Sequence, residues 1–430
     1  MFAALPLRGA QVGAGHEKLA HPLSKPLPVS EQVADAATPA VRSFYDRFPY
    51  PGDPLQDGPP PGYNWRWCHP CVVSACTGML PAQAGPLRLL DAGCGTGVST
   101  DYLAHLNPGA EILAVDISPG TLEVARRRLE RSGGARAAGS LRIEQRSLLD
   151  LQGEGPFDLI NSVGVLHHLR QPEAGLKALA ALLRPGGLLH LFLYADGGRW
   201  EIHRVQAALS LMGVHGDGEG LRLGRQLFDA LPPANRLRLH HEQRWALDTA
   251  ADANFADMYL HPQETSYDIK RLFDFVDQAD LSFAGFSNPQ VWDPARLLSG
   301  ELLERACALP ERERWALVEA LDPDISHFEF FLSRGELPRQ TWEDDATLLA
   351  AHGCRNPCLW GWPGASLLDP DLRPLDLTAD AVDLLTRIDQ APPATALSGL
   401  PLAWEPARIA SGARWLWQHR LLLLSAPAPA

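Results

Sequence analysis

The stretch Leu89–Gly97, LLDAGCGTG, limits what this chain can fold into more than any other. Leucines at positions 87, 89 and 90 form an apolar run that is typical of a buried strand. Residues Val98–Leu106 then have a helix-compatible pattern. The glycines at 93, 95 and 97 are therefore expected in a strand-to-helix turn, where a backbone can approach a ligand without interference from a Cβ atom.

An acidic residue at the end of the second predicted strand narrows the class of ligand that the glycine turn is expected to bind. The run Ile112–Val115 predicts a second strand, which ends in Asp116, 19 residues beyond Gly97. An acid at the tip of the second strand is placed to accept hydrogen bonds from ribose hydroxyls. A glycine turn alone is weak evidence, because dinucleotide-binding folds also use one. Here the pattern is Asp-x-Gly-x-Gly-x-Gly, beginning at Asp91.

Together these motifs resemble motif I and the following acid of the class I S-adenosylmethionine-dependent methyltransferases, over roughly residues 85–195. The resemblance implies that S-adenosylmethionine is the cofactor, that the glycine turn passes its amino-acid end and that Asp116 holds its ribose. A side chain at Gly95 would then point to the place of that amino-acid end. The residues expected at the cofactor are Asp91, Gly93, Cys94, Gly95, Gly97, Asp116, Ile117, Ser147, Leu148 and Gly164.

Two further stretches carry the same resemblance. In the family an acidic residue that contacts the adenine often stands at the position of Ser147. Here the serine departs from that pattern, so the backbone of Leu148 is expected to contact the adenine. Residues 165–169, VLHHL, look like a family stretch at the carboxyl edge of the sheet, where ligands bind in such folds. Imidazole titrates near neutrality, so His167 and His168 are the candidate catalytic bases, with hydrogen bonds that hold the loop as the alternative role.

Alternating strand and helix patterns predict an α/β fold with a doubly wound, mostly parallel sheet of seven strands. The expected strands are 87–92, 111–116, 140–146, 157–164, 188–194, 281–286 and 325–333, and the resemblance implies that the last is antiparallel. The helix from Pro119 is expected to begin with Ser118 as its cap, and its arginines at 126, 127, 128 and 131 to form a solvated face.

The chain divides into four expected parts. Residues 1–40 read as a mobile arm and residues 41–84 as an aromatic segment that forms either a lid over the ligands or a hydrophobic staple. Residues 85–334 are the expected methyltransferase domain, with a helical insertion at about 196–265. Residues 335–430 are an accessory module, in which 378–388 predicts a helix and 414–424 a helix or strand.

Composition limits the partners and the compartment. No run approaches the roughly 20 apolar residues of a membrane span, and no secretory signal is expected. An odd number of cysteines, seven, then favours reduced thiols in the cytoplasm. The net charge of −13 disfavours a nucleic-acid substrate.

The cysteines also raise the question of zinc. Cys68 and Cys71 have the spacing of a ligand pair, and Cys354 and Cys358 are candidates for a second pair. The second spacing is Cys-x3-Cys, so we favour buried thiols and expect no metal.

The acceptor is expected between the aromatic segment and the insertion, with Tyr50, Asp257, Tyr259 and His261 as its binding residues. The favoured function is methyl transfer to a small apolar or aromatic molecule. The alternatives are methylation of a protein or tRNA recruited by residues 335–430, and cofactor binding without catalysis. The sequence leaves open the attacking atom, the use of a base and the oligomeric state.

Overall fold

The computed structural model describes residues 39–60, 64–82 and 85–426. The arm expected in residues 1–40 lies almost wholly outside the described residues, as do residues 427–430 of the chain end. Among the described residues, no helix is both long and apolar enough to cross a membrane.

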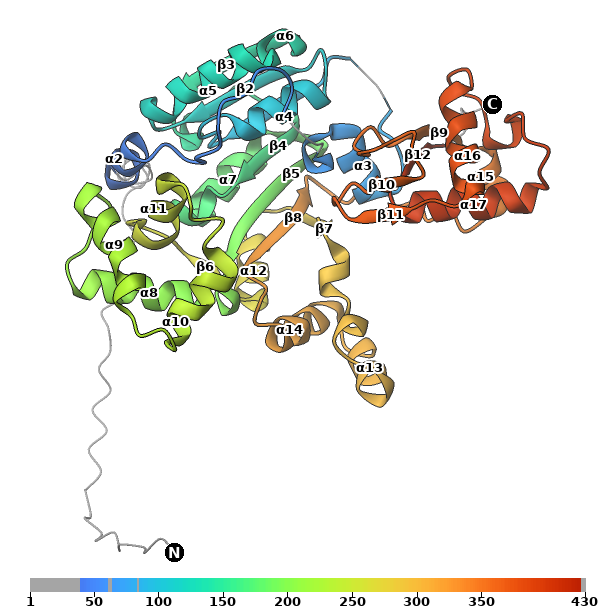
Figure 1. Cartoon of the computed structure of the whole chain (residues 1–430). Helices are drawn as coiled ribbons and strands as arrows, with labels where there is room; N and C mark the ends of the chain where they lie inside the picture. The colour runs from blue at the N-terminus through green and yellow to red at the C-terminus, as the bar shows by residue number, and fades with distance from the viewer. Residues whose placement is uncertain (1–38, 61–63, 83–84, 427–430) are drawn as a thin grey trace, which may run out of the picture. The chain divides into compact units, whose positions relative to one another are not determined.

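A mostly parallel sheet forms the centre of the fold (Figure 1). Its order is β3-β2-β1-β4-β5-β8-β7, with the short β6 paired to β5. The strands are β1 Arg88–Ala92, β2 Glu111–Asp116, β3 Ser140–Gln145, β4 Phe157–Val163, β5 Leu183–Ala195, β6 Ser266–Tyr267, β7 Ser282–Phe286 and β8 His327–Ser333. In this order, the strands β3, β2, β1, β4 and β5 run parallel to one another, whereas β8 is antiparallel to both of its neighbours, β5 and β7. The predicted doubly wound methyltransferase-type sheet is therefore confirmed.

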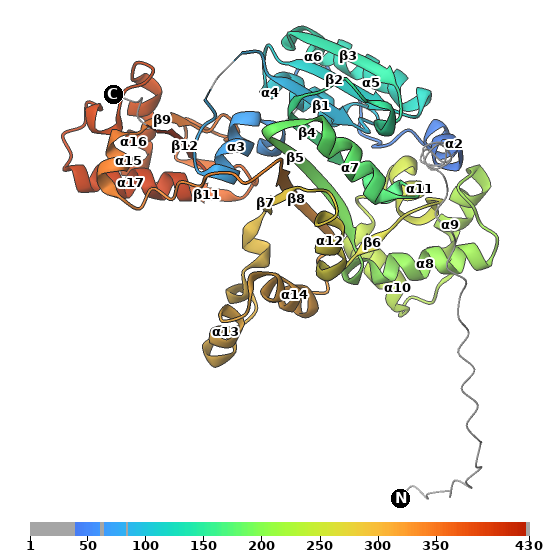
Figure 2. The ribbon, with the colours of Figure 1, turned by 180° about the vertical axis from the view of Figure 1, so that it is seen from behind.

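Helices cover both faces of this sheet, because successive residues of a buried strand point to opposite sides (Figure 2). In β1, Leu90 packs in one cluster with residues of α7 and α12, while Leu89 packs in another with residues of α3 and α4. The helices that cover the sheet are α3 His69–Thr77, α4 Val98–Leu106, α5 Pro119–Ser132, α7 Pro172–Leu182, α12 Ile269–Val276 and α14 Glu311–Leu321. The short α6 Gly134–Ala137 packs on α4 and α5, and α13 Gly300–Cys307 packs on α14 and projects away from the sheet (Figure 1).

The segment between β5 and β6 is a helical insertion with its own apolar core. Its helices are α8 Trp200–Leu211, α9 Gly218–Ala230, α10 Arg236–His240, a π-helical turn at His241–Trp245 and α11 Asp252–Leu260. Phe44 and Phe48, from α2 (Pro39–Arg47) and the residue that follows it, are buried in the same core as Phe228 and Phe255. The aromatic segment is thus joined to the insertion by burial of apolar surface.

The C-terminal residues have a separate apolar core, which includes Trp342, Leu385 and Leu416. It is built from α15 Asp345–Ala350, β9 His352–Arg355, β10 Ser366–Leu368, β11 Pro374–Asp376, α16 Ala379–Gln390, α17 Pro406–Gln418 and β12 Leu422–Ser425. Strand β12 pairs antiparallel with β9. The stretch 414–424, for which the pattern allowed a helix or a strand, contains the end of α17 and the start of β12.

Two expectations about the sheet region are wrong. Strand β5 begins at Leu183 rather than at 188, because Leu183 pairs with Phe157 and extends the strand. Arg128 is buried rather than solvated. Its guanidinium donates to the carbonyl oxygens of Thr96 at 3.0 Å and Asp53 at 2.8 Å, so it ties α5 to the N-terminal loop.

Candidate active site

A cavity of about 570 Å³ lies at the carboxyl edge of the parallel strands. Its walls combine the glycine turn, the ends of β2, β4 and β5, the aromatic segment and the insertion. Of the residues expected from the sequence, it is lined by Tyr50, Gly93, Cys94, Gly95, Asp116, Ile117, Ser147, Leu148, Gly164, His168 and Asp257. Asp91, Gly97, His167, Tyr259 and His261 do not line it.

The glycine turn has the backbone that its sequence requires. Gly93, Gly95 and Gly97 have φ of 84°, 52° and 82°, a region that other residues rarely adopt. A Cβ at Gly95 would lie 2.4 Å from the carbonyl oxygen of Tyr50. The expectation for Gly95 therefore needs correction, since a side chain there would collide with the protein's own aromatic segment rather than only with a ligand.

Asp116 lies at the tip of β2 and reaches back to the turn. Its Oδ2 accepts a hydrogen bond from Gly95 N at 2.9 Å, and its Oδ1 accepts from Ser118 N at 2.9 Å and Thr121 Oγ1 at 3.3 Å. Burial raises the pKa of Asp116. A carboxylate has about four acceptor positions, so one remains for a ribose hydroxyl in the cavity.

Asp91 and Gly97 support the glycine turn from the side away from the cavity. The carboxylate of Asp91 is fully buried and accepts from Ser99 Oγ at 2.7 Å, Thr100 Oγ1 at 2.5 Å and Asn161 Nδ2 at 2.8 Å. A Cβ at Gly97 would lie 2.9 Å from that of Ala125, so this glycine allows α5 to pack closely. Asp91 thus positions the turn through α4 and β4 without facing the cavity.

Beyond Asp116, the cavity continues past Ser147 and Gly164. The hydroxyl of Ser147 accepts from Leu149 N at 3.2 Å and caps the short 3-10 helix Leu148–Asp150. At Gly164, with φ of 74°, a Cβ would meet no atom within 4 Å, so the backbone there borders open space. A cradle of this kind, with an acid at one end and a bare glycine beside it, fits an adenosyl group.

At the end of the cavity away from Asp116, two tyrosines and an aspartate form a hydrogen-bonded polar group. Tyr45 on α2 donates to Asp257 Oδ1 at 2.9 Å, and Tyr194 at the end of β5 donates to Asp257 Oδ2 at 3.3 Å. Burial raises the pKa of Asp257 to about 6, although both hydroxyls act in the opposite direction. Around them Tyr50, Phe192 and other aromatic side chains line the cavity.

The histidines divide into one that faces the cavity and two that do not. His168 Nδ1 lies 2.9 Å from the carbonyl oxygen of Gln263, so Nδ1 donates and Nε2 keeps a lone pair. Burial lowers the pKa of His168 to about 4. His261 packs against His168 with ring centroids 3.8 Å apart and the rings tilted by 35°, and His167 is fully buried, with its ring centroid 3.9 Å from that of Tyr194.

Three side chains at this end lie close enough together to be considered as ligands of one metal ion. Ligand atoms of His168, Asp257 and His261 lie within 4.8 Å of one another. However, His261 Nδ1 accepts from Gln263 N at 3.1 Å, and both oxygens of Asp257 accept from tyrosines. These lone pairs are engaged by the protein, which favours a hydrogen-bonded network.

Two tyrosines expected at the acceptor have different positions. Tyr50 lines the cavity, and its carbonyl oxygen accepts from Thr96 N at 3.0 Å in the glycine turn. Tyr259 instead lies in the core of the insertion, where its hydroxyl lies 2.9 Å from His241 Nδ1.

Sequence reasoning missed Arg199. It lines the cavity, is 4% exposed and lies with its guanidinium carbon 3.5 Å from the ring centre of Tyr194. An ion pair with Glu264 at 3.3 Å holds it there. Its place just after β5, at the carboxyl edge of the sheet, was the signal that could have found it.

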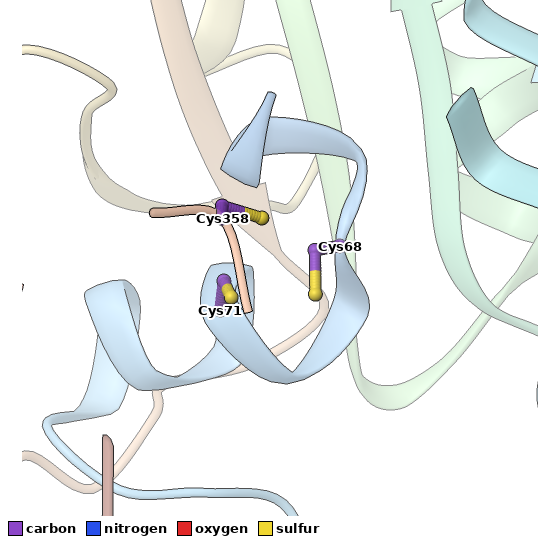
Figure 3. Close-up of side chains that lie close together, drawn as sticks. All are labelled: Cys68, Cys71 and Cys358. Atoms are coloured by element: carbon purple, nitrogen blue, oxygen red, sulfur yellow. The ribbon is translucent and has the colours of Figure 1, made fainter. Parts of the chain in front are cut away.

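Another candidate metal group lies outside the cavity. Cys68 and Cys71 lie at the start of α3, and Cys358 comes from the loop after β9 (Figure 3). Their sulfur atoms lie within 4.8 Å of one another, and all three residues are buried. The sequence pattern had favoured thiols that bind no metal.

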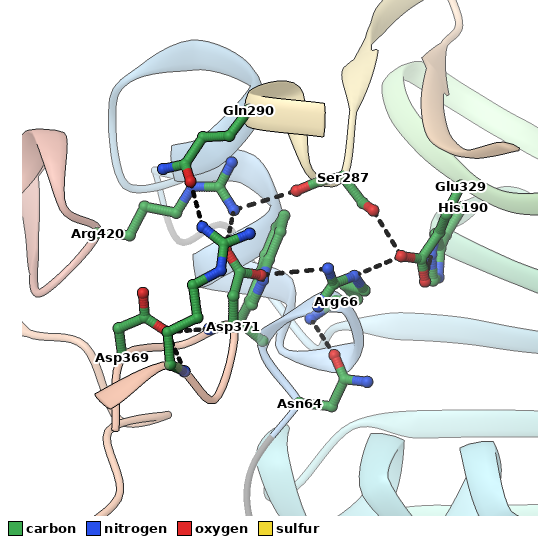
Figure 4. A network of polar contacts seen from close by, with 11 residues as sticks. Asn64, Arg66, His190, Ser287, Gln290, Glu329, Asp369, Asp371 and Arg420 are labelled. Carbon is green, nitrogen blue, oxygen red and sulfur yellow. Dashed lines mark hydrogen bonds and ion pairs between the residues drawn. The ribbon is translucent and has the colours of Figure 1, made fainter. Parts of the chain in front are cut away.

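A chain of polar side chains leads away from the turn, and Figure 4 shows its part from His190 to Asp371. Asn161 connects Asp91 to His190, with Asn161 Oδ1 2.9 Å from His190 Nδ1. His190 Nε2 lies 3.2 Å from Glu329 Oε1. Arg66 donates to Glu329 Oε2 at 2.6 Å and to Asp371 Oδ1 at 3.2 Å, and so joins β8 to the C-terminal part.

Comparisons with known proteins agree with this geometry. The family described as "Methyltransferase domain" matches residues 90–189, which contain the glycine turn, Asp116 and His168. An uncharacterized protein of Synechococcus is 48% identical over 398 residues, which is 91% of this chain and 94% of that protein. A ubiquinone biosynthesis O-methyltransferase of Methylocella silvestris is 41% identical over 112 residues, which is 25% of this chain and only 40% of that enzyme.

A solved structure supports the fold over a longer span. PKMT2 from Rickettsia typhi superposes with a TM-score of 0.59 at 16% identity, covering 85% of this chain and 77% of its own. The matched domain and the cavity at the edge of the sheet lead to one conclusion. The chain belongs to the class I S-adenosylmethionine-dependent methyltransferase family, and S-adenosylmethionine is its cofactor.

Proposed function

We propose that this enzyme transfers a methyl group to a small apolar or aromatic acceptor. One observation carries the proposal: a single cavity of about 570 Å³ contains the glycine turn and Asp116 and also the aromatic side chains of α2, β5 and the insertion. Small-molecule sites are typically concave, mostly apolar and provided with a few converging polar groups. The match to a ubiquinone biosynthesis O-methyltransferase supports the same class of acceptor.

The cofactor residues follow from the lining. Asp116 would accept from the ribose, the Gly93–Gly95 backbone would border the amino-acid end, and Leu148 and Gly164 would border the adenine. The cofactor supplies a methyl group on a positively charged sulfur. The chain's own task is then to align the acceptor and to exclude water from it.

At the acceptor end, Tyr45, Tyr194 and Asp257 offer the groups that orient a polar substituent. Asp257, with a pKa of about 6, is charged at neutral pH and is the stronger proton acceptor. His168 has a pKa of about 4 and stays neutral, so its Nε2 lone pair serves as a hydrogen-bond acceptor. His167 has no access to the cavity and takes no part in this proposal.

The test is a transfer assay with S-adenosylmethionine that carries a labelled methyl group. The purified chain is incubated separately with the small-molecule, protein and tRNA fractions of a cell extract. Label in an organic-extractable compound of low mass is the expected result. Label confined to protein or tRNA would contradict the small acceptor, and would support recruitment of a macromolecule instead.

A further inference from the structure

Three buried thiols converge at a point that methyl transfer does not use. Cys68, Cys71 and Cys358 are 1%, 2% and 1% exposed, and their sulfur atoms lie within 4.8 Å of one another (Figure 3). Two of them start α3, and the third follows β9 and is buried in the same apolar cluster as α3. The fold thus brings together thiols from segments far apart in the chain.

The spacing of the sulfur atoms is close to that of a tetrahedral zinc site. With Zn–S distances of about 2.3 Å, the sulfurs of such a site are about 3.8 Å apart. Cys-x2-Cys at the start of a helix, joined by a distant cysteine, is also a common arrangement of structural zinc ligands.

The loop that carries Cys358 is held in place independently of any metal. Asn356 is buried, and its Oδ1 accepts from Cys358 N at 2.8 Å and from Cys71 Sγ at 3.3 Å. Its Nδ2 donates to Arg420 O at 2.7 Å, next to β12. The bonds of Asn356 to Cys358 N and Arg420 O hold this loop in place before an ion binds, whereas the bond from Cys71 is lost when its thiol becomes a thiolate, so it is the backbone at Cys358 that is preorganised.

Cys354 precedes Cys358 by four residues on β9, but it is exposed and does not belong to the group of three. A tetrahedral zinc ion held by the three thiolates has one coordination position left for a fourth ligand.

The surroundings argue against a redox centre at the same place. A reactive cysteine needs an accessible, partly exposed sulfur, whereas the three thiols of this group are almost fully buried. We propose that Cys68, Cys71 and Cys358 bind one zinc ion as thiolates, with release of their protons, and that the ion fastens the loop after β9 to α3. This proposal is independent of the acceptor and of the transfer reaction.

The first test uses the full-length chain, purified without a polyhistidine tag and dialysed. Elemental analysis should find about one zinc ion per chain. After removal of zinc with a chelator, Co²⁺ should produce the intense visible bands of tetrahedral thiolate coordination, and Zn²⁺ should displace it. No zinc and no Co²⁺ bands, an iron content in place of zinc, or a disulfide between these cysteines under reducing purification would each overturn the proposal.

Substitutions of single cysteines test where the zinc ion binds. Cys68→Ser and Cys358→Ser should each lower the zinc content at least about fivefold. The matched control is Cys76→Ser, which changes another buried cysteine of α3 outside the group and should keep the zinc. If the cluster variants fail to fold, the chelator experiment still decides: the wild-type Tm should fall and return with Zn²⁺. A Tm that the chelator does not change, with zinc retained by both cluster variants, would refute the site.

Discussion

Asp116 is the residue on which cofactor binding depends most directly. Its carboxylate combines two roles, since it receives the Gly95 amide and borders the cavity. The Asp116→Ala change should weaken binding of S-adenosylmethionine by about 1.5–3 kcal/mol, the range for hydrogen bonds to a charged group. Calorimetric titration measures this loss. Asp150→Ala, an exposed acid on the neighbouring 3-10 helix, should leave the affinity unchanged.

The titration of Asp257 should be visible in the pH dependence of transfer. Its pKa is raised to about 6, so its carboxylate loses charge as the pH falls through that value. We expect kcat/KM for the acceptor to fall below about pH 6, with Asp257→Asn lowering the rate and removing this pH step. A pH step that persists unchanged in Asp257→Asn would assign the titration to another group.

The raised pKa of Asp257 affects stability and methyl transfer in opposite directions, so the two effects can be told apart. Because its folded pKa lies above that of an unfolded aspartate, Asp257 favours folding more as the pH falls from 6 to about 4. A loss of activity in that range would therefore not follow from unfolding caused by Asp257.

At the scale of elements, α2 and α11 form the two sides of the acceptor end, joined by the bond from Tyr45 to Asp257. Tyr45→Phe removes only that hydroxyl. It should leave cofactor affinity within about twofold while transfer falls about tenfold, as expected for the loss of one hydrogen bond to a buried charge. The matched control is Tyr259→Phe, in the core of the insertion, which should change neither quantity. Equal effects of both changes on transfer would mean that Tyr45 acts only through stability.

The polar chain from Asp91 to Asp371 links the turn, the sheet and the C-terminal part, and Figure 4 shows its course from His190 to Asp371. Burial raises the pKa of Glu329, but His190, Arg66 and Ser287 outweigh this effect and hold it well below the usual range. Glu329→Gln should therefore lower the free energy of unfolding by about 3 kcal/mol at pH 7, as for a broken buried ion pair. Asp277→Asn, in the exposed pair with Arg312, should cost at most about 1 kcal/mol.

The sign of the pH effect for Glu329 is fixed by its lowered pKa. Its stabilisation is present above the pKa of an unfolded glutamate, about 4.3, and is lost as the pH falls below that value. Urea titrations at pH 7 and pH 4 should therefore show a smaller difference between wild type and Glu329→Gln at the lower pH. A constant difference would mean that the charge of Glu329 contributes little.

Over the whole molecule, the positions of the main strands along the chain and the place of the glycine turn could be predicted, because periodicity and the motif beginning at Asp91 are local, whereas the order of the strands in the sheet comes from the structure. The buried role of Arg128 could not, since its acceptors at 53 and 96 are distant in the sequence. Arg199 carries no motif and acquires its place from the fold. The group at Cys358 depends on contact between α3 and the loop after β9, which no spacing in the sequence reveals.

The most direct measurement is a crystal structure of the chain with S-adenosylhomocysteine, the demethylated cofactor. We predict density inside the cavity, with the ribose at Asp116, the adenine beside Leu148 and the sulfur directed toward Tyr194 and Asp257. The space between the sulfur and these two residues should be large enough for a small aromatic ring. Density outside this cavity, or a sulfur directed toward an open surface away from Asp257, would contradict a shared site for cofactor and small acceptor.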